Sequence, residues 1–143
     1  MKSLFDCDDA GDMKEYVGCN IYYENWSFKF TKKVMVKIFK DEFDMPIHGT
    51  ITPGEPVTTL VKAEENGNIA QKRTTYFIFG VGKHFHVMRW SRPEIYNIVR
   101  DLLCHMSVVT ENHVKAMHRV MGYFSGTISK GWKMKPKIKW DIK

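Results

Sequence analysis

Two adjacent carboxylates near the start of the chain are the residues best suited to metal-dependent chemistry. Asp8 and Asp9 could hold Mg²⁺ for phosphoryl transfer, as paired aspartates do in many enzymes. That chemistry also needs a third carboxylate and a tight hairpin between apolar strands, but Ala10, Gly11 and Asp12 follow here. We therefore favour a solvated acidic turn over a metal site.

The histidines and the glycines near residue 80 give no recognisable site either. His84 and His86 are two residues apart and His113 and His118 are five apart, so neither pair has the i, i+4 spacing that aligns ligands on a helix. Gly80–Lys83 lacks the Ser or Thr and the glycine spacing of a phosphate loop. We expect structural or surface histidines, and we predict no catalytic residue, no metal site and no cofactor.

Charge is distributed unevenly along the chain. Residues 1–70 hold 8 lysines and 12 acidic residues, a net charge of −4, whereas residues 71–143 hold 14 basic and 4 acidic residues, a net of +10. Near the C-terminus four lysines alternate with other residues: Lys133, Lys135, Lys137 and Lys139. Such a basic half suits a polyanion such as nucleic acid, although a solvated basic face has the same composition.

Composition indicates the compartment. Cys7, Cys19 and Cys104 are an odd number at wide spacings, which is typical of reduced thiols and not of a disulfide framework. No apolar run approaches the roughly 18 residues of a membrane span, and the N-terminus lacks the apolar core of a signal peptide. We therefore expect an intracellular protein, cytoplasmic or nuclear, without a membrane partner; the oligomeric state stays open.

The N-terminal third predicts a β-hairpin. Residues 16–23 alternate in polarity as a strand does, and Gly18 inside that strand indicates a bulge or a close backbone approach. Glu24 and Asn25 can turn, and residues 26–30 alternate again. Helical spacing then begins after Thr31 and ends before Pro46.

Helices are expected over most of the remainder, after a Pro- and Gly-containing loop at 46–71. Residues 72–91 favour a helix, with a short strand at 77–80 as the alternative. Ser91 and Glu94 fit a capping box for a helix to about residue 106, and Thr110 can cap another that ends near Gly126. The lysine-rich end reads as an extended strand that Pro136 restricts to a sheet edge. The fold class is therefore α+β.

Several segments carry a resemblance to a known family. Residues 5–21 combine an aromatic residue, an Asp-Asp pair and Tyr-Val-Gly-Cys-Asn-Ile. Gly82-Lys83 is followed by Arg-Pro-Glu-Ile95, and Tyr-Phe-Ser-Gly-Thr127 ends a stretch that begins at His113. In this order, with the helix at 39–45, the segments resemble copia-type retrotransposon reverse transcriptase, an RNA-directed DNA polymerase. The family's catalytic Tyr-x-Asp-Asp motif does not occur in this sequence.

The resemblance implies an organisation and a partner. Residues 1–45 would form the end of the palm, with a primer-grip hairpin and a first thumb helix, and residues 46–71 would form a linker. Residues 72–127 would complete a thumb-like bundle of about four helices, counting the first thumb helix. Residues 128–143 would be a basic extended tail that leads toward an RNase H domain. The implied partner is a template–primer duplex, and Mg²⁺ belongs only to the intact parent enzyme. The expected contacts are Tyr16, Gly18, Gly82, Lys83, Arg89, Arg92, Lys133, Lys135, Lys137 and Lys139.

The expected function is a fragment of a transposable element without polymerase activity, which retains at most weak, sequence-independent binding of nucleic acid. The alternative is a decayed transposon remnant with no biochemical activity, or an interaction module adopted by the host.

Overall fold

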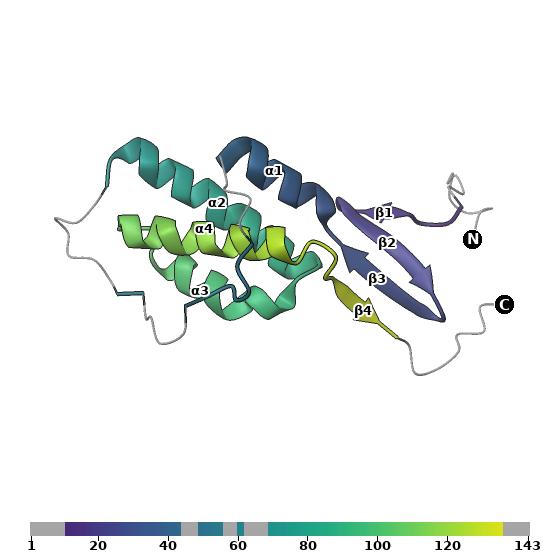
Figure 1. Ribbon diagram of the computed structural model, residues 1–143. Helices are drawn as coiled ribbons and strands as arrows, with labels where there is room; N and C mark the ends of the chain where they lie inside the picture. The colour runs from purple at the N-terminus through teal and green to yellow at the C-terminus, as the bar shows by residue number, and fades with distance from the viewer. Residues whose placement is uncertain (1–10, 44–48, 56–59, 62–68, 136–143) are drawn as a thin grey trace, which may run out of the picture.

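A small antiparallel sheet lies at one end of the molecule and a bundle of helices at the other (Figure 1). The structure, a computed structural model, describes residues 11–43, 49–55, 60–61 and 69–135. Asp8, Asp9, Lys137 and Lys139 therefore lie outside the described residues. The arrangement confirms the predicted α+β class, with an N-terminal hairpin that leads into a bundle of four helices.

The sheet has four strands in the order β1 (Glu15–Tyr16), β2 (Cys19–Glu24), β3 (Ser27–Thr31) and β4 (Trp132–Met134), each antiparallel to its neighbour. The predicted strand over residues 16–23 is interrupted, because Val17 and Gly18 form a turn with φ angles of 50° and 68°. Gly18 therefore lies in a tight hairpin turn and not in a bulge. Two consecutive positive φ angles suit such hairpins, since their twist matches that of the strands.

The second hairpin turn also differs from the prediction by one residue. Asn25 and Trp26, with φ angles of 48° and 58°, connect β2 to β3. Trp26 is therefore a turn residue and not the first residue of a strand.

The C-terminal strand closes the sheet. Extended structure at a sheet edge was predicted for the lysine-rich end, and within the described residues β4 pairs with β3 alone. Pro136, on which the edge prediction depends, lies outside the described residues. Trp132 lies opposite Phe30, and Lys133 lies opposite Lys29. Gly131 makes the approach possible, because a Cβ at this position would overlap the carbonyl oxygen of Phe30. The sequence did not indicate which strand β4 would join.

Four helices enclose the core: α1 (Lys33–Phe43), α2 (Gln71–Trp90), α3 (Tyr96–Cys104) and α4 (Glu111–Gly126). A 3₁₀ turn, Pro93–Ile95, precedes α3. The fully buried side chains come from every helix and from the connections between them, and the largest include Phe39, Phe77, Ile95, Leu102, Met117 and Phe124. Because each helix places an apolar stripe toward this centre, the bundle and not the sheet carries the core.

The helix boundaries agree with the sequence at α4 and differ at α3. The Thr110 side chain caps α4 by accepting a hydrogen bond from the His113 N–H at 3.4 Å, as predicted. Ser91 instead ends α2, because its hydroxyl donates to the Val87 carbonyl at 3.3 Å. The predicted capping box at Ser91 and Glu94 is therefore wrong. The alternative strand at residues 77–80 is also excluded, since these residues lie inside α2.

Part of the predicted linker packs on the bundle. The Thr50 N–H donates to the Gly122 carbonyl at 3.3 Å, and its hydroxyl donates to the Arg119 carbonyl at 3.1 Å. Gly49 and Gly126 touch so closely that a Cβ on either would press on the other's backbone. Among the described residues, none of the helices combines the length and the apolar character that crossing a bilayer requires.

Candidate nucleic-acid interface

One face of the sheet carries a row of lysines beside a tyrosine. Tyr22 of β2 lies opposite Lys29 of β3, which in turn lies opposite Lys133 of β4. Lys33, at the start of α1, places its ammonium 5.4 Å from the centre of the Tyr22 ring. We call Tyr22, Lys29, Lys33 and Lys133 the basic sheet face. All four residues are exposed.

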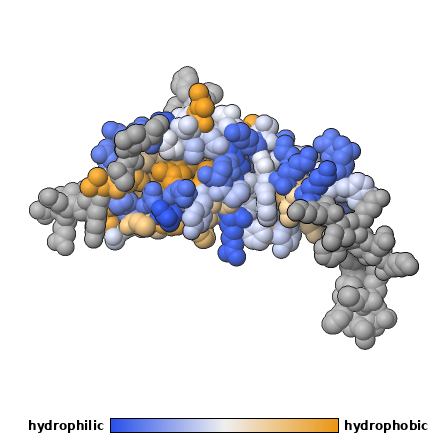
Figure 2. Space-filling view, turned by 90° about the horizontal axis from the view of Figure 1, so that it is seen from below, coloured by the Kyte–Doolittle hydropathy of each residue, from blue (hydrophilic) through white to orange (hydrophobic). Residues whose placement is uncertain are grey.

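The basic sheet face lacks internal neutralisation. Among the ion pairs of the described residues, none involves Lys29, Lys33 or Lys133. Two carboxylates share the face at its margins: Glu15 lies on β1 opposite Asn20, and Glu24 lies at the hairpin end opposite Ser27. Like charges directly opposite each other on neighbouring strands repel, so the pairing of Lys29 with Lys133 costs stability in the free protein. Figure 2 shows hydrophilic side chains at the sheet end, on the right of that view, as well as along the helical part of the same face.

The sequence-predicted residues of the hairpin and the tail lie near this end. Tyr16 is half exposed in β1, and its ring meets that of Trp90 edge-on at 5.9 Å. Gly18 forms the turn beside it. Lys133 is part of the basic sheet face, and exposed Lys135 follows β4 directly.

The predicted residues on α2 lie apart from the basic sheet face and are partly engaged. The Lys83 ammonium forms an ion pair with Glu42 of α1 at 2.5 Å. Arg89 is exposed, with its guanidinium 5.8 Å from the centre of the Trp90 ring. Gly82 faces open space, because a Cβ there would meet no atom within 4 Å.

Arg92 is the predicted contact that the structure places inside the protein. The residue is only 4% exposed, and its guanidinium donates to both the carbonyl and the hydroxyl oxygen of Thr127, at 3.1 and 2.7 Å. Glu94 pairs with it at 2.5 Å, and the rings of Tyr123 and Phe124 lie against it at 5.1 and 5.2 Å. Arg92 holds the end of α4 to the start of α3, so we leave it out of the interface.

A further cation went unrecognised in the sequence. Lys32 is 8% exposed, and its ammonium bonds the Val17 carbonyl at 3.0 Å and His86 Nδ1 at 2.6 Å. Burial lowers the pKa of Lys32, and burial together with Lys32 lowers the pKa of His86. Nothing in Thr-Lys-Lys at 31–33 shows which lysine turns inward, because only the position of the strand end decides it.

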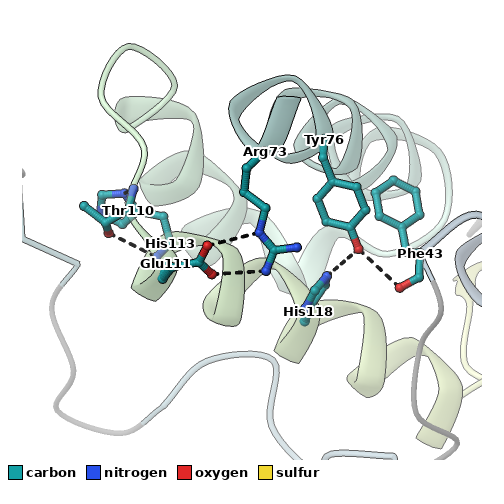
Figure 3. Close-up of polar contacts among 7 residues, drawn as sticks. All are labelled: Phe43, Arg73, Tyr76, Thr110, Glu111, His113 and His118. Atoms are coloured by element: carbon teal, nitrogen blue, oxygen red, sulfur yellow. Dashed lines mark hydrogen bonds and ion pairs between the residues drawn. The ribbon is translucent and has the colours of Figure 1, made fainter. Parts of the chain in front are cut away.

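A second cluster of polar residues joins α2 to α4 (Figure 3). The Arg73 guanidinium donates two hydrogen bonds of 3.1 Å to the Glu111 carboxylate, and these bonds lower the pKa of Glu111. The Tyr76 hydroxyl donates to the Phe43 carbonyl at 3.2 Å and lies 2.7 Å from His118 Nε2. Since that hydroxyl has one proton, His118 Nε2 must donate to the tyrosine oxygen. The chain of bonds ties three helices together.

Hydrogen bonds at the N-terminal end of α4 likewise hold the fold together. His113 Nδ1 accepts from the Thr110 N–H at 3.1 Å, so Nε2 carries the proton and bonds the Val61 carbonyl at 3.1 Å. Burial lowers the pKa of His113 and of His118. Both histidines form hydrogen bonds within the protein, in line with the structural alternative of the two predicted roles, structural or surface. Within the described residues, no three potential ligands among His, Cys, Asp and Glu lie close enough together to hold a metal ion.

Comparison with known proteins adds no relative: no protein-family model, no curated protein and no solved structure matches this chain.

Proposed function

We propose that this chain is a non-catalytic nucleic-acid-binding part of a reverse transcriptase of the copia type, and that the basic sheet face is its contact with the phosphate backbone. The ancestry rests on the ordered motifs of the sequence, which include Gly82-Lys83 and Arg-Pro-Glu-Ile95. The binding rests on one observation, the un-neutralised pairing of Lys29 with Lys133 beside Tyr22 and Lys33.

A bound polyanion would remove a repulsion between lysines that the folded protein otherwise carries. Phosphates laid over β3 and β4 would contact the opposite lysines, one at Lys29 and one at Lys133, and the counterions released from the nucleic acid would drive binding. Such contacts are indifferent to base sequence. No step of nucleotide addition is proposed for this chain, because the family's catalytic motif is absent from its sequence.

The test is duplex affinity as a function of salt for two charge-matched double variants. Lys29→Ala with Lys133→Ala removes the facing pair, and Lys72→Ala with Lys115→Ala removes two exposed lysines on α2 and α4. We expect the first variant to flatten the log–log salt dependence by about two units, at roughly 0.9 per phosphate. The second should leave it nearly unchanged in fluorescence anisotropy with a short labelled duplex.

Two outcomes would refute the proposal. One is the absence of measurable binding by the wild type at low salt, which would favour the remnant without activity. The other is an equal loss in the two double variants, which would reduce the interface to net charge alone.

A further inference from the structure

The outer side of α2 carries large apolar side chains that face solvent, among polar residues such as Lys72 and Arg89. The buried side of the helix includes Phe77 and Val81, as a core helix requires. Away from that buried side Ile78, Phe79 and Phe85 are 38%, 64% and 42% exposed. Exposed apolar side chains that gather in this way mark interaction sites. Nothing among the described residues covers this stripe.

The stripe continues into a groove between α1 and α2. This open groove, of about 350 Å³, is lined by Met35 and Ile38 of α1 and by Phe79, Gly82 and His86 of α2, among others. Gly82 opens the floor, because no atom lies within 4 Å of where its Cβ would be. Glycine inside a helix costs about 1 kcal/mol relative to alanine, and no internal contact requires it here. A flat site of this kind accommodates the backbone of a second helix.

The charge around the groove selects the occupant. No Asp or Glu occurs in α2, and exposed Lys72 and Arg89 lie toward the two ends of its outer side. Behind His86, buried Lys32 makes its bonds to a carbonyl and an imidazole, with no carboxylate among the described residues that pairs with it. The other wall, α1, carries Lys33, Lys37 and Lys40 against Asp41 and Glu42, and Glu42 pairs with Lys83 of the groove at 2.5 Å. The groove is therefore apolar at its floor and has a net positive charge around it.

These properties favour another protein over a second copy of the chain as the partner. Two α2 helices laid against each other would bring cations together with no acidic residue between them. An acidic helix, by contrast, would place carboxylates opposite Lys72 and Arg89. The 17-residue step between those two cations spans about 25 Å at 1.5 Å per residue, the length of roughly five helical turns.

We propose that the groove between α1 and α2, with the outer stripe of α2, is a docking site for an acidic amphipathic helix of another protein. Its apolar side chains enter beside Phe79 and over Gly82, and its carboxylates lie toward Lys72, Arg89 and the Lys32–His86 pair. Helix-in-groove recognition of this kind uses apolar anchors at i, i+3, i+4 and i+7. The proposal is independent of nucleic-acid binding by the basic sheet face.

The test uses three labelled peptides of about 18 residues, matched in length to the stripe. The first has Leu at helical spacing and Glu elsewhere, the second replaces every Glu by Lys, and the third scrambles the acidic peptide. We expect the first to bind the full chain at least about ten-fold more tightly than the others in fluorescence anisotropy. Phe79→Glu should abolish that preference, while Tyr96→Glu, at a 54% exposed position on α3, should preserve it.

Several results would overturn the docking proposal. They are tighter binding of the lysine peptide, equal binding of the scrambled peptide, and unchanged binding in a folded Phe79→Glu variant. Sedimentation of the chain alone gives a fourth: a dimer that Phe79→Glu converts to a monomer would make a second copy the occupant. Circular dichroism confirms that both variants fold. Because the two surfaces are proposed to be independent, Phe79→Glu should bind duplex as the wild type does.

Discussion

His84 is a titratable side chain fixed in the centre of the core. It is fully buried between Phe39 and Phe124, whose ring centres lie 5.2 and 5.8 Å away. Within the part of the chain that the structure describes, neither ring nitrogen has a hydrogen-bond partner. Burial, with a smaller contribution from His118, lowers the pKa of His84 to about 3. The side chain is therefore neutral in the folded protein, and its protonation opposes folding.

That burial predicts a pH-dependent stability with a defined sign. The unfolded pKa is near 6.5 and the folded pKa about 3, so the unfolded state binds the proton first. Stability due to His84 is complete above pH 6.5 and falls by about 1.4 kcal/mol per pH unit as the pH drops toward 3. His84→Leu should remove this dependence and be about 1 kcal/mol more stable at pH 8, since it deletes two unbonded polar atoms.

Urea unfolding of both proteins at pH 8, 6 and 5 measures the difference. The lowered pKa values of His113 and His118 remain in the variant, so some acid sensitivity is expected to persist. Identical pH profiles in the two proteins would contradict the assignment.

Single residues mark the limit of what the sequence could predict. The role of Thr110 as a helix cap depends on neighbours a few residues away, and it is confirmed. Pro46, the predicted terminator of the first helix, lies outside the described residues. Arg92 was predicted as a nucleic-acid contact, but it is buried against Thr127, 35 residues away in the sequence. The buried Lys32 was not predicted, because its partner His86 lies 54 residues away. No local pattern contains that information.

At the scale of elements, the contact between α2 and α4 depends on one glycine. A Cβ on Gly80 would collide with the Met117 sulfur and press on the methyl groups of Met117 and Met121. Both methionines are buried, so they have little room to move aside. Gly82, two residues further along the same helix, faces open space.

The two glycines therefore predict opposite effects of the same substitution. Gly80→Ala should destabilise the protein by about 1 kcal/mol or more, through overpacking against α4. Gly82→Ala should stabilise it by about 0.5–1 kcal/mol, because alanine restricts the unfolded chain and favours the helix. Chemical denaturation measures the free energy of unfolding of both variants, and each variant serves as the control for the other. A loss of stability in Gly82→Ala would mean that the outer side of α2 is not open.

Elements were predictable where their periodicity is strong. The helices that became α1 and α4 and the pairing of β2 with β3 follow from apolar spacing and turn residues, and all are confirmed. The ambiguity over residues 77–80 arose because α2 is apolar on both sides, which removes the helical contrast. The basic sheet face could not be assembled in advance, since Lys29 and Lys133 meet only through the register of β3 with β4.

The whole molecule is closed by its last described strand. β4 covers the edge of β3, which otherwise exposes unpaired backbone groups along five residues, Ser27–Thr31. Open edges of apolar strands pair with other chains. The apolar faces of Phe28, Phe30 and Trp132 make this edge prone to association, and the exposed lysines on β3 and β4 counteract it.

Truncation tests the importance of that closure. A chain that ends after Thr127 lacks β4, and we expect it to retain the helical bundle but to aggregate or dimerise through β3. A chain that ends after Lys135 retains β4 and should remain monodisperse if the full chain is. Light scattering at equal concentrations distinguishes the two, with circular dichroism to confirm helix content. Equal behaviour of both truncations would show that the edge of β3 needs no cover.

The pairing of Phe30 with Trp132 also determines the order in which the molecule assembles and opens. The hairpins form from contacts close in sequence, whereas this pairing joins residues roughly 100 positions apart. It becomes easy only after the bundle has brought α1 and α4 together, where Phe39 stacks on Phe124 at 5.6 Å, because the bundle then closes most of that loop. Strand docking should then come last in folding, and local opening should release β4 before the bundle loosens, with early hydrogen exchange of its amides. A phosphate backbone that contacts both Lys29 and Lys133, as proposed, would hold the N-terminal and C-terminal parts of the chain together and oppose that opening.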